Sequence, residues 1–261
     1  MRNEQTKKAS QRNFQIRDNA AQTTLPAASM QPLLSTSPDS QTAPPLYWWL
    51  VCGFMALALI PTAWTALDLT AANLFMGANP QSEEATWFWV VLINDYVPAA
   101  FRVCVLIALA AWVTISVSKK VPHWRLPLAF VVIAGTLGPG VVVNNGFKDN
   151  WQRARPYQVQ NFGGDKLFTR AAVMTDQCDA NCSFVSGHVA CGFFLASLML
   201  VHRRRAVAWA LTGCTAGLAI GFSRMADRAH WLSDVLWAGP ITLLSSWLVW
   251  KFLLWAYRPR H

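Results

Sequence analysis

The clearest chemical pattern in this chain lies in residues 223–234, a short polar stretch between two long apolar segments. His230 and Asp234 are four residues apart, so on a helix they share one face. A carboxylate at that spacing can accept a hydrogen bond from one ring nitrogen and leave the other nitrogen to react. Arg224, upstream, brings a fixed fork of donors to an anion. The stretch predicts a nucleophile, its orienting acid and an anion clamp; the alternative is a polar cap beside a membrane.

A second polar cluster supplies further positive charge. Residues 148–156 read Lys-Asp-Asn-Trp-Gln-Arg-Ala-Arg-Pro and follow an apolar segment directly. Together with Arg224, the side chains of Lys148 and Arg155 provide three cations for the equatorial oxygens of a phosphate. Arg153, in the same cluster, could either touch substrate or form a salt bridge.

A third cluster, residues 183–188, reads Ser-Phe-Val-Ser-Gly-His and opens another apolar segment. Ser186 and Gly187 are expected at a helix N-terminus, where unpaired amides point at an anion and the helix dipole favours negative charge. His188 is placed to protonate a leaving oxygen, and His230 is placed to attack phosphorus. The three clusters together therefore predict a site for phosphoryl transfer.

The composition predicts that these clusters are carried by a membrane protein. The chain has 261 residues, of which 54% are hydrophobic and 13% charged, and it contains 14 Trp. Its apolar residues come in runs of about 20, the length of a membrane-spanning helix. The formal net charge of +9 is most simply explained by basic cytoplasmic flanks, because no basic tract interleaved with aromatic residues indicates nucleic-acid binding.

The predicted fold is all-α and polytopic, with six transmembrane helices in one domain, residues 46–261. The six spans are expected at about residues 46–67, 97–117, 126–143, 185–201, 206–222 and 235–255. Residues 1–45 are polar, lack an apolar run and are predicted to be a disordered cytoplasmic tail.

The orientation follows from the basic residues in short turns. Lys119, Lys120 and residues 203–205 flank two turns on the side of the termini, while the first loop on the opposite side has no Lys or Arg. Because cytoplasmic loops carry an excess of Lys and Arg, the termini are expected to be cytoplasmic. The three polar clusters then share the extracytoplasmic face.

The three clusters resemble the type 2 phosphatidic acid phosphatase superfamily, whose signature is Lys-x6-Arg-Pro, then Pro-Ser-Gly-His, then Ser-Arg-x5-His-x3-Asp. Residues 148–156 match the first motif and residues 223–234 match the third. The second motif departs at one position, because Val185 stands where proline is usual. Proline would stiffen the turn but supplies no donor, so this change is expected to be tolerated.

The resemblance implies a lipid phosphatase that needs no metal or other cofactor and forms a phosphohistidine intermediate. It implies that His230 is the nucleophile, Asp234 its partner and His188 the general acid. The phosphate-binding residues that it implies are Lys148, Arg155, Ser186, Gly187 and Arg224. The substrate would be a lipid phosphate in the bilayer, without an obligate protein partner, and the location a bacterial inner membrane with a periplasmic active site.

The lipid itself stays open between several classes. The order Cys-x3-Cys-Ser-Phe-x-Ser-Gly-His is similar to lipid A phosphatases of this superfamily, which favours lipid A. Undecaprenyl pyrophosphate and phosphatidylglycerophosphate are rivals, because the phosphate motifs are common to all of them. A lipid transporter that kept the scaffold without catalysis, and a haloperoxidase-like vanadate site, are alternatives that the intact histidines or the apolar spans disfavour.

Two of the six cysteines, Cys178 and Cys182, lie in the predicted outward-facing loop before the third cluster. An oxidising compartment favours a disulfide between them, which would close a tight loop and help to fix the next helix. Free thiols are the alternative, because so short a loop does not guarantee the geometry.

Overall fold

The computed structural model describes residues 42–77, 87–118 and 121–257, and the regular elements in that part of the chain are helical. The main helices are α2 (Pro45–Ala63), α3 (Ala66–Asn73), α4 (Phe88–Ser118), α5 (Arg125–Gly135), the π-helical segment η3 (Thr136–Lys148), α6 (Asp149–Trp151), α7 (Gly187–Ser197), α8 (Ala206–Ala226) and α9 (Leu232–Ala256). The short turns are η2 (Pro122–Trp124), η4 (Pro156–Gln158), η5 (Gln160–Phe162), η6 (Leu198–Leu200) and η7 (Arg203–Arg205). The prediction of an all-α fold is confirmed; most of the predicted tail, residues 1–41, lies outside the described residues.

Five helices in the described residues are long and apolar enough to cross a membrane, and the chain is a multi-pass membrane protein. They cover Pro45–Ala63, Phe88–Ser118, Pro122–Lys148, Arg203–Ala226 and Leu232–Ala256. The segment predicted as the fourth span is also helical, but it is short, since it consists of the 11 residues of α7 and the single turn η6. At 1.5–2 Å per residue it rises about 22 Å, less than the roughly 30 Å of a bilayer core. Six spans therefore stay a prediction.

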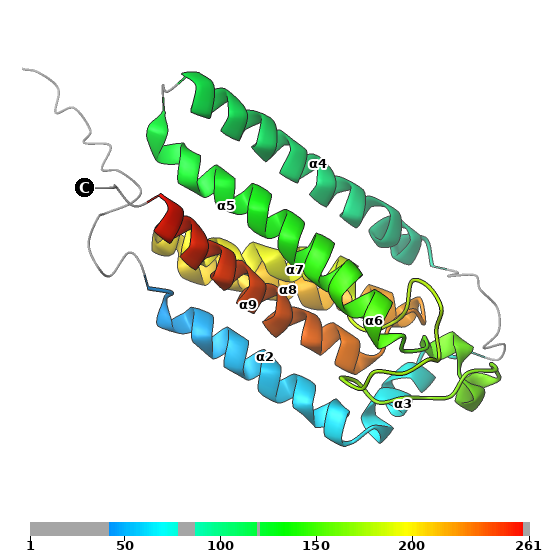
Figure 1. The fold of residues 1–261 in the computed structure, drawn as a ribbon. Coiled ribbons are helices and arrows are strands. Elements are labelled where there is room, and N and C mark those ends of the chain that lie inside the picture. The colour runs from blue at the N-terminus through cyan, green and yellow to red at the C-terminus, as the bar shows by residue number, and fades with distance from the viewer. Residues whose placement is uncertain (1–41, 78–86, 119–120, 258–261) are drawn as a thin grey trace, which may run out of the picture. The chain divides into compact units, whose positions relative to one another are not determined.

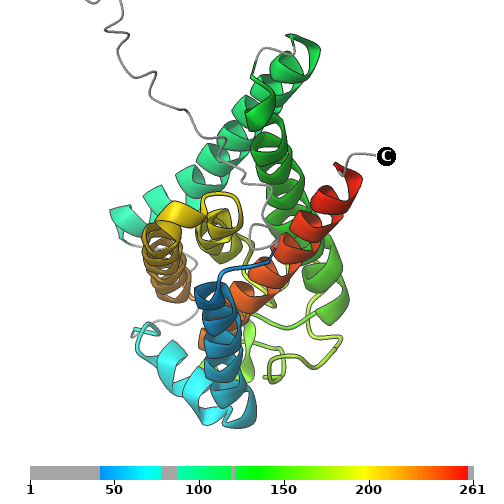
Figure 2. The ribbon, with the colours of Figure 1, turned by 90° about the vertical axis from the view of Figure 1, so that its left-hand side faces the viewer.

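Helix α4 shows why this fold needs an apolar solvent. Only 6% of its most apolar window is buried against the rest of the protein, although it is 31 residues long. It lies along one edge of the helices within the unit Thr36–His261, beside α5 (Figures 1 and 2). The helix begins nine residues before the predicted start at Val97, because Asn94 and Asp95 are polar but do not break a helix.

The centre of the helical unit is α7, which packs against α8 and α9. A Cβ atom on Gly213 of α8 would lie 2.2 Å from the backbone nitrogen of Ala196, so only glycine allows this approach of the two helices. Phe193 of α7 is fully buried in a cluster with Phe54 of α2 and Val235 of α9. This packing fixes the start of α7 relative to the start of α9.

The long segment between η3 and α7, residues 149–186, carries most of the polar side chains that meet these helix ends. This segment, which begins with α6, lies with α3 at one end of the helices (Figure 1). Trp231, just before α9, is 1% exposed and donates from Nε1 to the carbonyl oxygen of Ala154 at 2.9 Å. This contact joins residues 148–156, the second polar cluster, to the polar stretch 223–234.

Candidate active site

His230 and Asp234 lie beside each other at the start of α9, but His230 precedes the helix. The N-cap of α9 is Trp231, and Asp234 is the third helical residue. Asp234 Oδ2 accepts a hydrogen bond from the backbone N–H of Trp231 at 2.9 Å, which caps the helix. His230 Nδ1 lies 3.7 Å from Asp234 Oδ2, which is close but too long for a hydrogen bond.

Asp234 is held in place by a buried network. Arg153 Nη1 donates to Asp234 Oδ1 at 2.6 Å, and the hydroxyl of Ser183 donates to Asp234 Oδ2. The same arginine donates from Nη2 to Asp68 Oδ2 at 2.8 Å and from Nε to the carbonyl oxygen of Thr169 at 2.8 Å. The side chains of all three charged residues have no exposed surface. One cation therefore fixes two carboxylates from helices α3 and α9.

Two further contacts close this network. Asp68 accepts from the backbone N–H of Ser233 at 2.8 Å and from its hydroxyl at 2.6 Å. The guanidinium of Arg153 lies 5.2 Å from the ring centre of Trp231, a cation–π contact. Burial is the largest influence on Asp68 and raises its pKa, while the charge of Arg153 opposes that rise.

Sequence patterns left the role of Arg153 open and did not single out Asp68 at all. The only sequence signal for Asp68 is its position, as an acidic residue directly after an apolar span. Asp227 pairs with a neighbouring charge, since its Oδ2 lies 2.7 Å from Arg224 Nη1.

Positive charge from two of the clusters, residues 148–156 and 223–234, gathers around His230. Arg224, Lys148 and Arg155 each lie close enough to His230 to act on its protonation, and so does His188. The same three cations also act on His188. The structure thus brings together the two imidazoles and the three cations that the sequence predicted for one site.

The buried ring of His230 is held in its neutral form. Burial is the main cause that lowers its pKa well below the ordinary value of about 6.5, and Arg224, Lys148 and Arg155 lower it further. Neither ring nitrogen has a hydrogen-bond partner within the described part of the chain. A neutral imidazole with an unprotonated nitrogen is the form that can act as a nucleophile.

Ser186 and Gly187 lie at the N-terminus of α7, as predicted. Ser186 is the N-cap residue, and a Cβ atom on Gly187 would lie 2.7 Å from Asn144 Oδ1, so a larger residue would push into η3. His188 follows in the first turn, and its Nε2 lies 3.1 Å from the carbonyl oxygen of Asn94 in α4. The side chain of Ser186 makes no capping hydrogen bond at this helix end, where the first amides of a helix attract an anion.

Several buried polar atoms of this region have no hydrogen-bond partner among the described residues. They are Ser186 Oγ, Ser223 Oγ, Arg224 Nε and both ring nitrogens of His230. Burying such an atom unpaired costs about 1–3 kcal/mol. Donors and cations dominate the set, which fits the oxygens of a phosphoryl group. Among the described residues, no three His, Cys, Asp or Glu side chains are grouped to hold a metal ion.

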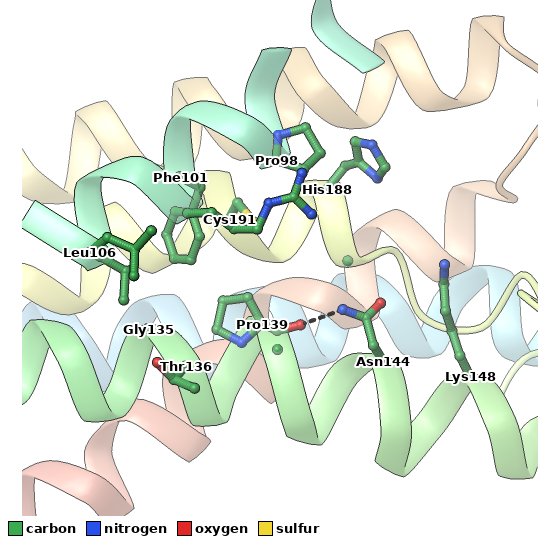
Figure 3. A pocket seen from close by; sticks show the side chains of 14 residues that line it. Pro98, Phe101, Leu106, Gly135, Thr136, Pro139, Asn144, Lys148, His188 and Cys191 are labelled. Carbon is green, nitrogen blue, oxygen red and sulfur yellow. Dashed lines mark hydrogen bonds between the residues drawn. The ribbon is translucent and has the colours of Figure 1, made fainter. Parts of the chain in front are cut away.

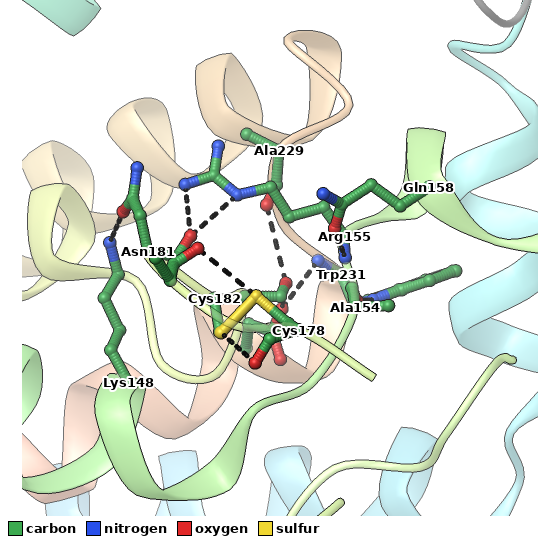
Figure 4. The surroundings of a disulfide bond; sticks show 12 residues. Lys148, Ala154, Arg155, Gln158, Cys178, Asn181, Cys182, Ala229 and Trp231 are labelled. Atoms are coloured by element: carbon green, nitrogen blue, oxygen red, sulfur yellow. Dashed lines mark hydrogen bonds between the residues drawn. A yellow bond between two sulfur atoms is a disulfide. The ribbon is translucent and has the colours of Figure 1, made fainter. Parts of the chain in front are cut away.

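The structure joins Cys178 and Cys182 in a disulfide next to the cations (Figure 4). Both cysteines are buried. The remaining four, Cys52, Cys104, Cys191 and Cys214, are unpaired.

Fold and site together define a multi-pass helical membrane protein in which two histidines and three cations meet at the helix ends. The chain belongs to the PAP2 superfamily, whose family model matches residues 124–258. That match contains all three polar clusters. The protein is therefore a PAP2-family phosphatase, an enzyme that hydrolyses phosphoric monoesters.

Three curated relatives are named lipid A 4'-phosphatase. The protein of Francisella tularensis subsp. novicida is 34% identical over 160 residues, which cover 60% of this chain and 71% of the relative. That of Rhizobium leguminosarum is 36% identical over 126 residues, 47% of this chain and 52% of the relative. That of Rhizobium etli is 37% identical over 120 residues, 45% of each chain, so the matches span about half of both Rhizobium proteins. No solved structure matches the chain.

Replacing Arg153 by methionine should destabilise the protein and abolish most activity. The change leaves the carboxylates of Asp68 and Asp234 buried without a counter-ion, and breaking a buried ion pair in this way costs about 3–5 kcal/mol. Thermal unfolding in detergent and phosphate release measure the two effects. Lys166→Met is the control, because its ion pair with Asp165 is long, at 3.8 Å, and exposed. An Arg153→Met protein as stable as the control would contradict this role.

Proposed function

We propose that this chain removes a phosphate from lipid A at the periplasmic face of a bacterial inner membrane, through a phosphohistidine at His230. The observation that carries the proposal is the buried, neutral imidazole of His230 surrounded by the cations Lys148, Arg155 and Arg224. The names of the relatives support lipid A as the substrate and its 4'-phosphate as the group removed.

In the first step, Nε2 of His230 attacks phosphorus and forms a P–N bond while the ester P–O bond breaks. His188 donates a proton to the leaving oxygen of the lipid, so that the lipid departs as an alcohol. The phosphoryl dianion between His188 and His230 favours the protonated form of His188 that this step requires. Asp234 stabilises the positive charge that develops on the ring of His230, and Arg153 keeps that carboxylate oriented.

In the second step, water attacks the phosphorus atom of the phosphohistidine from the side opposite to His230. His188 accepts a proton from that water, the P–N bond breaks, and inorganic phosphate leaves with His230 neutral again. Throughout both steps the cations stabilise the charge that spreads over the equatorial phosphoryl oxygens. The amides at the start of α7, beginning with Gly187, add hydrogen-bond donors to the same oxygens.

An apolar cavity beside the site supports a lipid substrate. It has a volume of about 460 Å³ and lies between α4, α5, η3 and α7. Pro98, Phe101 and Leu106 of α4 line its apolar part, and Lys148 and His188 lie at its polar end (Figure 3). A phosphate bound by these two side chains would place the adjoining hydrocarbon of the same molecule along α4.

Charge and redox chemistry support the periplasmic side. Arg125 and Arg203–Arg205 lie at the starts of α5 and α8, the helix ends opposite to Lys148 and Arg224. Excess basic charge in short turns marks the cytoplasmic side of a membrane protein. The disulfide near the site suits an oxidising compartment. Six spans, with α7 and η6 as the fourth, would place both termini in the cytoplasm.

Purified protein in detergent should release inorganic phosphate from lipid A, also in the presence of EDTA. His230→Ala should lower the rate by at least roughly 10³-fold, because it removes the nucleophile. His123→Ala is the matched control. His123 lies in η2, just before α5, whereas the site lies at the other end of this helical segment, at Lys148. Full activity in His230→Ala would refute the mechanism.

The same assay with undecaprenyl pyrophosphate and phosphatidylglycerophosphate tests the substrate. A higher kcat/KM for either lipid than for lipid A would reassign it. Release from none of these lipids would favour a non-catalytic transport role.

The value of kcat/KM should also stay high down to an unusually low pH. A histidine with an ordinary pKa would lose its nucleophilic form below about pH 6.5, but burial and three cations hold the pKa of His230 below that value. We expect kcat/KM to stay high on acidification through pH 6.5 and to fall only at lower pH. A fall that begins above pH 6.5 would show that His230 titrates normally.

A further inference from the structure

Two of the proposed phosphate-binding cations meet at one residue, Asn181. Its backbone carbonyl oxygen accepts hydrogen bonds from Nε and Nη2 of Arg155 at 3.0 and 2.7 Å. Its side-chain oxygen Oδ1 accepts from Nζ of Lys148 at 2.7 Å. Figure 4 shows Asn181 between these side chains. Lys148 and Arg155 come from opposite ends of the second polar cluster, so Asn181 contacts both ends of that cluster.

The loop that carries Asn181 is fixed at both ends. Cys178 and Cys182 enclose it in a disulfide with four residues of sequence separation, and both are buried. Asn181 itself has φ 51°, in the left-handed region that asparagine tolerates better than most residues. The backbone N–H of Ser183 donates to the carbonyl oxygen of Arg153 at 2.8 Å, which ties the loop to the second cluster.

The chemistry of these contacts preserves positive charge. A carbonyl and an amide oxygen are neutral acceptors, so they orient a guanidinium and an ammonium without cancelling their charge. Arg224 differs, because its partner is the carboxylate of Asp227 at 2.7 Å. The bonds to Asn181 use one edge of the Arg155 guanidinium, whose five N–H groups leave others for a ligand.

We propose that Asn181, seated by the Cys178–Cys182 disulfide, is a positioning residue that holds Lys148 and Arg155 at the spacing needed to bind a phosphoryl group. This inference rests on the proposed function, in which both cations bind phosphate. It assigns the disulfide a role in substrate affinity, so that reduction of the disulfide weakens phosphate binding. A disulfide that only anchors the start of α7 would have no such effect.

Direct binding of inorganic phosphate, measured by isothermal titration calorimetry in detergent, tests the inference without relying on catalysis. Asn181→Ala should weaken phosphate binding by roughly tenfold, the value of one charge-assisted hydrogen bond, because Lys148 loses its anchor. Asn181→Asp should weaken it at least as much, because the new carboxylate neutralises Lys148. Asn161→Ala is the matched control, since it removes an exposed asparagine from the same long loop.

Two comparisons separate positioning from general support. In a Lys148→Met background, Asn181→Ala should have no further effect on phosphate binding, although alanine at this positive φ lowers the unfolding temperature in both backgrounds. A reductant should weaken phosphate binding by the wild-type protein. It should leave the Cys178→Ser, Cys182→Ser double variant unchanged, although that variant keeps the other four cysteines.

Unchanged phosphate binding in Asn181→Ala and Asn181→Asp would overturn the inference. Tighter binding in Asn181→Ala would overturn it as well, because Asn181 would then compete with phosphate. Failure of the wild-type protein to bind phosphate would have the same consequence. If the wild-type protein binds phosphate more tightly than the Asn181 variants but hydrolyses no lipid, the positioning role stands and the proposed reaction fails.

Discussion

The rest of the site depends on the buried guanidinium of Arg153, which forms ion pairs with two carboxylates. It lies between the carboxylates of Asp68 and Asp234 with no exposed surface on any of the three side chains. Charges buried in this way are tolerated only when they are paired and hydrogen-bonded, so the three groups must stay together. Their pairing fixes α3 and the long loop against the start of α9. Asp234 therefore keeps its position beside His230 without relying on the histidine.

The remaining charge in the site is arranged to stay unbalanced. Lys148 and Arg155 donate to the neutral oxygens of Asn181, and Arg224 pairs with the carboxylate of Asp227. Excess positive charge keeps the buried His230 neutral, since another cation beside it would be unfavourable. A phosphate dianion relieves the same excess. In the proposed mechanism, one arrangement of charge thus keeps the nucleophile His230 neutral and attracts the phosphoryl group that it attacks.

The residues that we propose to bind a phosphate could be picked out from the sequence more readily than those that support them. The spacing of Lys148, Arg155, His188 and His230 identified the site because each lies in a short polar cluster at the end of an apolar segment. Asp68 meets Ser233, 165 residues away, and no local pattern encodes so distant a contact. The contacts of Asn181 also depend on a loop conformation that its sequence does not specify. The apolar runs predicted the helices, but they did not predict the short length of α7 or the continuation of α4 through the polar residues Asn94 and Asp95.

Trapping of the covalent intermediate tests the central mechanism most directly. The protein would be mixed with lipid A labelled with 32P, quenched in alkali, where a phosphohistidine survives, and digested for mass spectrometry. We predict that wild-type protein and Asn161→Ala carry the label on His230, and that the label is lost in acid. His230→Ala should carry none. Label on another residue, or turnover of lipid A without any labelled protein under conditions that preserve phosphohistidine, would contradict nucleophilic catalysis by His230.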